Sequence, residues 1–223
     1  MSDAPPPVVP IFSMPFAVRE VPAARQLNPD VAQALAKHAS ANPAQRSSSS
    51  DPFCYQSRDD LLDWADGPVR QVCDEVLKGV WATAAAVNTF TPGQLESFTM
   101  QARGWFTIVQ PNGCMPSTQH ALTSWCAIYC VQAPPASAER ADSGVLRLYE
   151  SRLATMFTDA TNSTMRIPFT PGHYSWRPVP GHLAVFPGFV NHEIPLIRSS
   201  ESLTLIMIRA RFVAPGQEGF TRW

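Results

Sequence analysis

The apolar positions divide the chain into a helical first part and a strand-rich second part. Up to residue 88 they recur at helical spacing, and the clearest run predicts a helix from Val69 to about Val87. An earlier helix is expected to start at Asn28, whose side chain can cap it, and Pro29 suits its first position. That helix is expected to end near Ala41, because an Asn-Pro step follows.

After Pro92 the pattern changes to short apolar runs separated by Pro and Gly turns. The runs predict strands at Gln94 to Gln110, Thr123 to Val131, Val145 to Tyr149, Arg166 to Phe169, Leu183 to Phe186, Glu193 to Ile197 and Ser202 to Val213. Helices followed by strands indicate a mainly β fold, with N-terminal helices packed outside a two-sheet barrel. We expect a Pro-rich leader over residues 1–26, with one strand from Val8 to Met14. A single domain should follow over residues 27–223, with its helices within 27–88.

Composition narrows the classes of function. The 17 Lys and Arg against 18 Asp and Glu give a net charge of −1, so nothing favours nucleic acid or an anionic membrane as a partner. No apolar run approaches the roughly 20 residues that span a bilayer. Residues 1–7 lack the basic start and apolar core of a secretory signal. The five cysteines form no CxxC pair, which argues against a disulfide framework or a structural zinc site and favours a cytoplasmic location.

Candidate chemistry centres on residues 180–194. A Pro-Gly turn precedes a buried strand, a second Pro-Gly turn ends that strand, and His192 follows where the next strand begins. This arrangement suits a metal-ligand histidine in a small two-sheet barrel.

A series of landmarks accompanies this segment in a fixed order between about Phe53 and Phe212. They are Cys54-Tyr55-Gln56-Ser57, Trp105, Pro111-Asn112-Gly113 to His120, Ala127 to Val131, Ser143-Gly144-Val145-Leu146, Glu150-Ser151-Arg152 and Pro180 to Glu193. Together they resemble a family of small 2-oxoglutarate- and Fe(II)-dependent oxygenases with a double-stranded β-helix fold, a barrel of the jelly-roll or cupin type. The resemblance implies a dioxygenase that uses O2 to hydroxylate, desaturate or cyclise a small organic or amino-acid-derived substrate.

The resemblance also implies a metal site. Fe(II) would be held by His120 and His192, which would then be the catalytic residues, and 2-oxoglutarate would be the cosubstrate. An iron that activates O2 needs protein ligands on one face and open positions opposite. The sequence leaves the identity of the third metal ligand open, and the candidates are Glu150, Thr118, Gln119 and water.

Three positions depart from the family pattern. Thr118 stands where the family has the first of two histidines, and Leu122 stands where a His-x-Asp motif would have its carboxylate. The segment Ser202-Leu203-Thr204 has no arginine, although the family clamps the 2-oxoglutarate carboxylate with one there.

Other residues could bind the cosubstrate instead. A carboxylate favours a bidentate guanidinium, and Arg152 and Arg198 are the candidates that we assign, with the hydroxyl of Tyr129 as a further donor. Arg209 and Arg211 share one face of the last strand, which a solvated outer face would also explain.

Two other interpretations stay open. Without the clamp arginine, the barrel could be an iron oxygenase in which the substrate itself chelates the metal. The altered metal motifs would also suit a non-enzymatic barrel that serves as a binding or assembly module.

Cys126 and Cys130 share a strand face with Ile128 and are expected to be small buried hydrophobic residues rather than ligands. The N-terminal helices could support a homodimer face.

Overall fold

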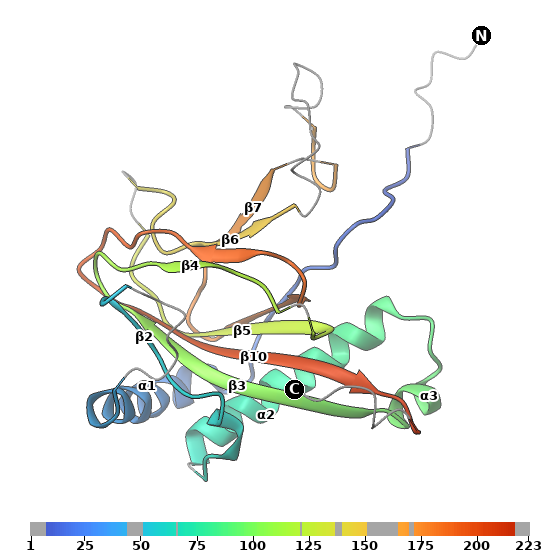
Figure 1. The fold of residues 1–223 in the computed structure, drawn as a ribbon, viewed down its shortest axis with the longest axis horizontal. Coiled ribbons are helices and arrows are strands. Elements are labelled where there is room, and N and C mark those ends of the chain that lie inside the picture. The colour runs from blue at the N-terminus through green and yellow to red at the C-terminus, as the bar shows by residue number, and fades with distance from the viewer. Residues whose placement is uncertain are drawn as a thin grey trace.

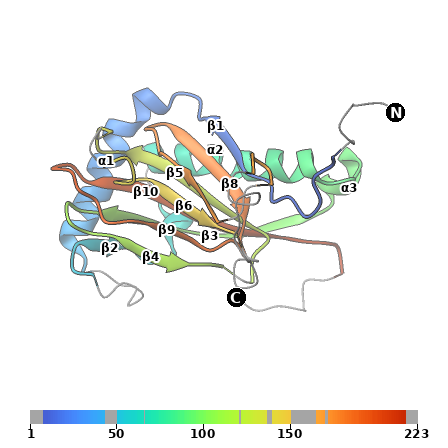
Figure 2. The same cartoon turned by 90° about the horizontal axis from the view of Figure 1, so that it is seen from above.

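Two antiparallel β-sheets face each other in the computed structural model, which describes residues 8–43, 51–65, 67–120, 122–136, 140–150, 165–169 and 172–216. The large sheet has the order β1 (Ala17–Glu20), β8 (His182–Pro187), β5 (Trp125–Gln132), β10 (Leu203–Val213), β3 (Thr99–Val109) and β2 (Cys54–Gln56). The small sheet has the order β4 (Met115–Thr118), β9 (His192–Ile194), β6 (Leu146–Tyr149) and β7 (His173–Trp176). The small sheet is stacked on one face of the large sheet (Figures 1 and 2).

Helices cover the other face of the large sheet. Figure 1 shows α1 (Ala24–Ala41) and α2 (Gly67–Val87) together on the side away from the small sheet. A 3-10 turn over Leu61–Asp63 precedes α2, and α3 (Pro92–Glu96) leads into β3. In the part of the chain that the structure describes, no helix is both long and apolar enough to cross a membrane.

The middle of the large sheet is therefore buried on both faces, and its buried apolar residues divide between two cores. Along β10, Ile206 and Ile208 pack in the core beneath the helices, whereas Leu205 and Met207 pack in the core between the sheets. Because side chains alternate along a strand, this register also fixes the face of the residues that follow. The inter-sheet core is the one that matters for the candidate site.

The structure confirms a mainly β fold with N-terminal helices, and α2 lies where it is expected. The first helix starts earlier than expected, at Ala24, so Asn28 lies inside it and is not its cap. The buried Asn28 side chain donates from Nδ2 to the carbonyl of Val131 and accepts at Oδ1 from the hydroxyl of Tyr129. These bonds to β5 tie the helix to the sheet, a tertiary role that the local sequence does not reveal.

Several strand predictions need correction. The strand near the N-terminus is β1, which pairs with β8, whereas Val8 to Met14 forms no strand. The fold thus already includes part of the expected leader. Residues 166–169 form a turn, and β7 takes the place of the strand expected there. The remaining expected strands are present with shifted ends, and β2 and β4 are short additional strands.

Candidate metal centre

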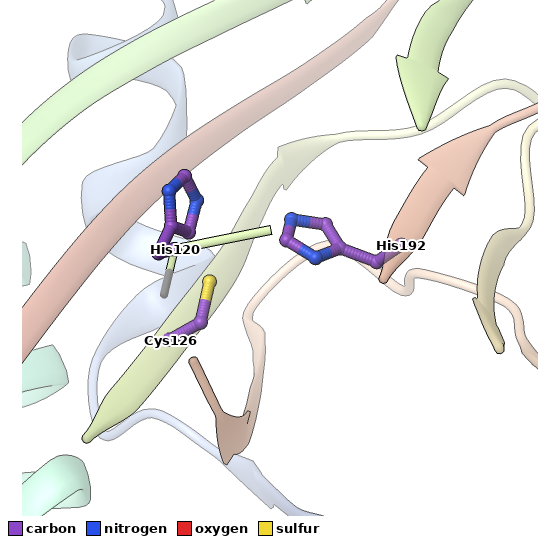
Figure 3. A group of neighbouring side chains, drawn as sticks. All are labelled: His120, Cys126 and His192. Atoms are coloured by element: carbon purple, nitrogen blue, oxygen red, sulfur yellow. The ribbon is translucent and has the colours of Figure 1, made fainter. Parts of the chain in front are cut away.

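His120, Cys126 and His192 meet at one end of the space between the sheets. His120 lies in the loop that leads from β4 to β5, Cys126 is near the start of β5, and His192 is the first residue of β9. Their ligand atoms all lie within 4.8 Å of one another. Figure 3 shows the thiol of Cys126 directed toward the space between the two imidazole rings, whose centroids are 5.5 Å apart.

His192 is held in a form that suits metal binding. The residue has no exposed surface, and its Nδ1 lies 3.0 Å from the carbonyl oxygen of Val190. A carbonyl can only accept, so this bond places the proton on Nδ1 and leaves the lone pair on Nε2. Within the described residues, that buried Nε2 has no hydrogen-bond partner. Burial lowers the pKa of His192, against a smaller opposing effect of the bond to Val190, which keeps the ring neutral as a ligand requires.

His120 is positioned through its backbone. Its N–H donates to the carbonyl of Gly188 at 2.7 Å, and its own carbonyl accepts from both the N–H and the hydroxyl of Thr123. The ring of His120 meets Trp105 of β3 edge-on at 5.2 Å between centroids. The Pro187-Gly188 turn that the sequence singles out therefore supports both histidines, because it also leads directly to His192.

Cys126 lies on the inter-sheet face of the large sheet, between Phe186 of β8 and Arg209 of β10 in the strand register. Its side chain is fully buried, and burial raises the pKa of the thiol. The expectation that Cys126 is buried beside Ile128 is confirmed. The structure adds that Cys126 lies beside both histidines. The sequence signal for this neighbourhood is the position of Cys126 at the start of the strand that follows the His120 loop.

The donor set fits a divalent transition-metal ion, because imidazole nitrogens and a thiolate are established ligands of such ions. Among the described residues, no carboxylate joins this group of three. Glu193, next to His192, instead accepts from Arg147 at 3.1 Å and from the Tyr149 hydroxyl at 2.6 Å. Leu122, at the position of the expected carboxylate, is 72% exposed.

The other expected third ligands come from β4, from the loop after it and from the residue after β6. Thr118 pairs with His192 across β4 and β9 and is half-buried, and Gln119 is exposed. Glu150 follows β6 and lines a neighbouring cavity.

Tyr129 does not line the site, which corrects its expected role as a cosubstrate ligand. It belongs to the core beneath the helices, on the opposite face of β5 from Cys126, and its hydroxyl donates to Asn28. Arg198 is exposed in the loop after β9, where its N–H donates to the Ser143 hydroxyl. Arg152 lies outside the described residues.

Arg209 is the cation that the structure brings to the site face. Leu205 and Met207 point between the sheets, so Arg209 does as well, and it stands directly across from Cys126. The polar face of this strand is thus the continuation of the barrel interior and not a solvated outer face. Arg209 forms an ion pair with Asp59 at 3.1 Å. Leu203, at the family's clamp position, is buried in the core.

A cavity of about 430 Å³ adjoins the centre. The N-terminal segment from Ile11 to Phe16 forms one wall, and Tyr174 and Glu150 contribute to the others. Phe186 and Val190 also line it. The Phe186 ring lies 5.1 Å from the His192 ring, and the Val190 carbonyl holds His192. The Phe186 side chain therefore borders both the cavity and His192.

Solved structures share this architecture. A Pseudomonas putida prolyl-4-hydroxylase matches over 88% of this chain and 91% of its own, with 14% identity and a TM-score of 0.55. HygX from Streptomyces hygroscopicus, solved with nickel and 2-oxoglutarate bound, matches over 95% of this chain and 86% of its own, with 11% identity and a TM-score of 0.57. SnoN, a non-haem α-ketoglutarate-dependent epimerase of nogalamycin biosynthesis, matches over 92% and 84%, with 11% identity and a TM-score of 0.55.

At these identities the likeness establishes the fold, and it confirms the expected double-stranded β-helix. The sequence itself matches no protein-family model and no curated protein. The fold is that of the oxygenases which the sequence landmarks resemble.

Proposed function

We propose that this protein is a non-haem Fe(II)- and 2-oxoglutarate-dependent oxygenase that oxidises a small organic or amino-acid-derived substrate. The observation that carries the proposal is the meeting of His120 and His192 inside the barrel, with their ring centroids 5.5 Å apart. These are the two histidines that the sequence landmarks single out. Their convergence in a fold used by metal-dependent oxygenases supports a metal-dependent role.

Each residue of the centre has a definable task. The Val190 carbonyl orients the His192 ring so that Nε2 faces the cluster, and the Gly188 carbonyl holds the His120 backbone in place. A bound Fe(II) ion would supply the activation of O2, with 2-oxoglutarate as the co-reactant. Burial excludes water from the His192 side of the centre, which protects a reactive site.

Arg209 is the residue that we propose for the cosubstrate carboxylate. It is on the interior face of the central strand β10, directly across from Cys126. A guanidinium can bind a carboxylate through two parallel hydrogen bonds. Asp59 already pairs with it but is 42% exposed in its side chain, so the incoming carboxylate would share or displace that contact.

The cavity next to the centre is the proposed substrate site. Its walls are mostly apolar and aromatic, and their polar groups come from Ser13, Glu150, His173 and the hydroxyl of Tyr174. Its volume of about 430 Å³ is in the range of small-molecule sites. This supports a small, largely apolar substrate that is oriented by a few polar contacts.

An anaerobic Fe(II) titration with and without 2-oxoglutarate, followed by visible absorption, tests the proposal. We expect a weak visible charge-transfer band that requires both additions. The band should vanish in His192→Ala and persist in the control His182→Ala, which alters a histidine at the opposite end of β8 from Phe186. Release of succinate on exposure to O2 and substrate would complete the assignment.

A second candidate is an iron oxygenase on the same fold that does not use 2-oxoglutarate. The ion pair between Arg209 and Asp59 favours it, because the interior cation already has an anionic partner. Iron binding without the cosubstrate-dependent band would support this candidate. Absence of iron binding in the folded protein would instead indicate a non-enzymatic binding module with the same barrel fold.

A further inference from the structure

We propose that Cys126 is the third protein ligand of the metal, so that the centre is built from two imidazoles and one thiolate. This inference rests on the proposed function, because it concerns the same ion. It assigns a role to a residue whose strand pattern alone indicates only a buried hydrophobic position.

The first argument is the convergence of the three side chains. Their donor atoms lie within 4.8 Å of one another, and they come from a loop, from the large sheet and from the small sheet. Figure 3 shows that Cys126 and His192 point toward a common space. Donors on one ion lie about 3 to 3.6 Å apart at bond lengths of about 2.0–2.3 Å. The most widely spaced pair would therefore close by at most about 1–2 Å.

The second argument is the state of His192. Its Nε2 is buried, carries the lone pair, and has no hydrogen-bond partner among the described residues. A buried polar atom is costly unless something binds it. A metal ion between this nitrogen and the Cys126 sulfur would satisfy it.

The third argument is charge. Oxygenase centres of this type pair two neutral histidines with one anionic ligand, yet no carboxylate of the described residues joins His120 and His192. A thiolate supplies the same single negative charge. On binding, the metal–sulfur bond would form as the S–H bond breaks, and the proton would pass to solvent.

Cobalt(II) is the probe for the test. Wild-type protein, Cys126→Ser and Cys130→Ser should be titrated anaerobically with Co(II) and followed in the near-ultraviolet and visible range. Cys130 is a matched control, since it is also buried on the inter-sheet face of β5 but lies outside the cluster.

We expect an intense sulfur-to-cobalt charge-transfer band in the wild type and in Cys130→Ser, and its loss in Cys126→Ser. The affinity of Cys126→Ser for Co(II) should fall by at least the ~10- to 100-fold that the loss of an outer-shell partner costs. Serine is close in size to cysteine. X-ray absorption of the cobalt-loaded wild type gives an answer without any variant, and should show one sulfur neighbour at about 2.3 Å.

The outcomes separate the two proposals. Cobalt binding with ligand-field bands but no sulfur band or sulfur neighbour would overturn the role of Cys126 and leave the two-histidine site intact. A sulfur band that survives in Cys126→Ser would overturn it as well. A folded wild-type protein that binds no cobalt would contradict the metal site itself, and the proposed function with it.

Discussion

His120 and Gly188 are joined backbone to backbone, with the His120 N–H 2.7 Å from the Gly188 carbonyl oxygen. The two residues also fit closely in space. A Cβ on Gly188 would lie 3.0 Å from the His120 carbonyl oxygen and 2.6 Å from that of Thr123. Position 188 therefore requires glycine because the loop that carries His120 packs against it, and not because of an unusual backbone angle.

We predict that Gly188→Ala displaces the His120 loop and weakens metal binding. Backbone atoms cannot yield as a flexible side chain does, so the free energy of unfolding should also fall by about 1–3 kcal/mol. Cobalt or iron titration and thermal unfolding would measure both effects. Gly93→Ala is the control, since a Cβ there meets no atom within 4 Å. Unchanged metal affinity in Gly188→Ala would contradict this role for the turn.

Tyr129→Phe should reduce stability without affecting the metal or 2-oxoglutarate. The phenol oxygen donates to Asn28 inside the helix-side core, so its loss leaves a buried amide oxygen unsatisfied. The expected cost is about 1–3 kcal/mol of unfolding free energy. Urea unfolding and the Fe(II) titration with 2-oxoglutarate would be compared on the same preparation. A weaker 2-oxoglutarate-dependent band in Tyr129→Phe would mean that Tyr129 does take part in the site.

Arg209→Gln should weaken the binding of 2-oxoglutarate while leaving metal affinity unchanged. The substitution keeps a polar side chain on the interior face but removes the charge and the paired donors. We expect at least a tenfold rise in Kd, about 1.4 kcal/mol, as measured by calorimetry on the metal-loaded protein. Arg198→Gln is the control, because Arg198 is exposed beyond β9. Equal losses in both variants would argue against a specific clamp.

Asp51 should make stability depend on acidic pH. Its carboxylate accepts from the N–H of Phe53 and from that of Cys114 at 2.7 Å, and these bonds lower its pKa below 3.8, the Phe53 bond most of all. A lowered folded-state pKa stabilises the protein above the unfolded-state value, and this contribution is lost as pH falls through the folded-state pKa.

The stability difference between wild type and Asp51→Asn should therefore be largest near neutral pH and should shrink below the ordinary aspartate value. Urea unfolding at several pH values would measure it. Asp30→Asn, at an exposed position on α1, is the control. A difference that does not change with pH would mean that the charge of Asp51 is not what the two N–H groups recognise.

The sequence predicts the parts of this fold whose apolar pattern is strong. The long strands β5 and β10 and helix α2 can be predicted because each buries many residues. β4 and β7 cannot be predicted in this way, since their residues are mostly exposed or half-buried and so carry no hydrophobic signal. The role of Asn28 is not predictable from local sequence because its partners, Val131 and Tyr129, are more than 100 residues away in the chain.

The same division between local pattern and long-range contact applies to the site. The sequence identifies His120 and His192 through their turns, and it places Cys126 on the face of Ile128. That this face looks onto the two histidines depends on how the small sheet stacks on the large one. Local patterns contain no information about that stacking, so the sequence predicts a buried thiol at Cys126 but not its place beside the two histidines.

The proposed ligands come from different layers, which has a mechanical consequence. Cys126 belongs to the large sheet and His192 to the small one, and β9 is only three residues long. An ion bound to both would act as a cross-link between the layers, in the way that a disulfide joins distant segments. Removal of the ion by a chelator would then abolish the proposed activity and would also loosen one wall of the barrel. That wall would be the first part of the barrel that a protease cuts.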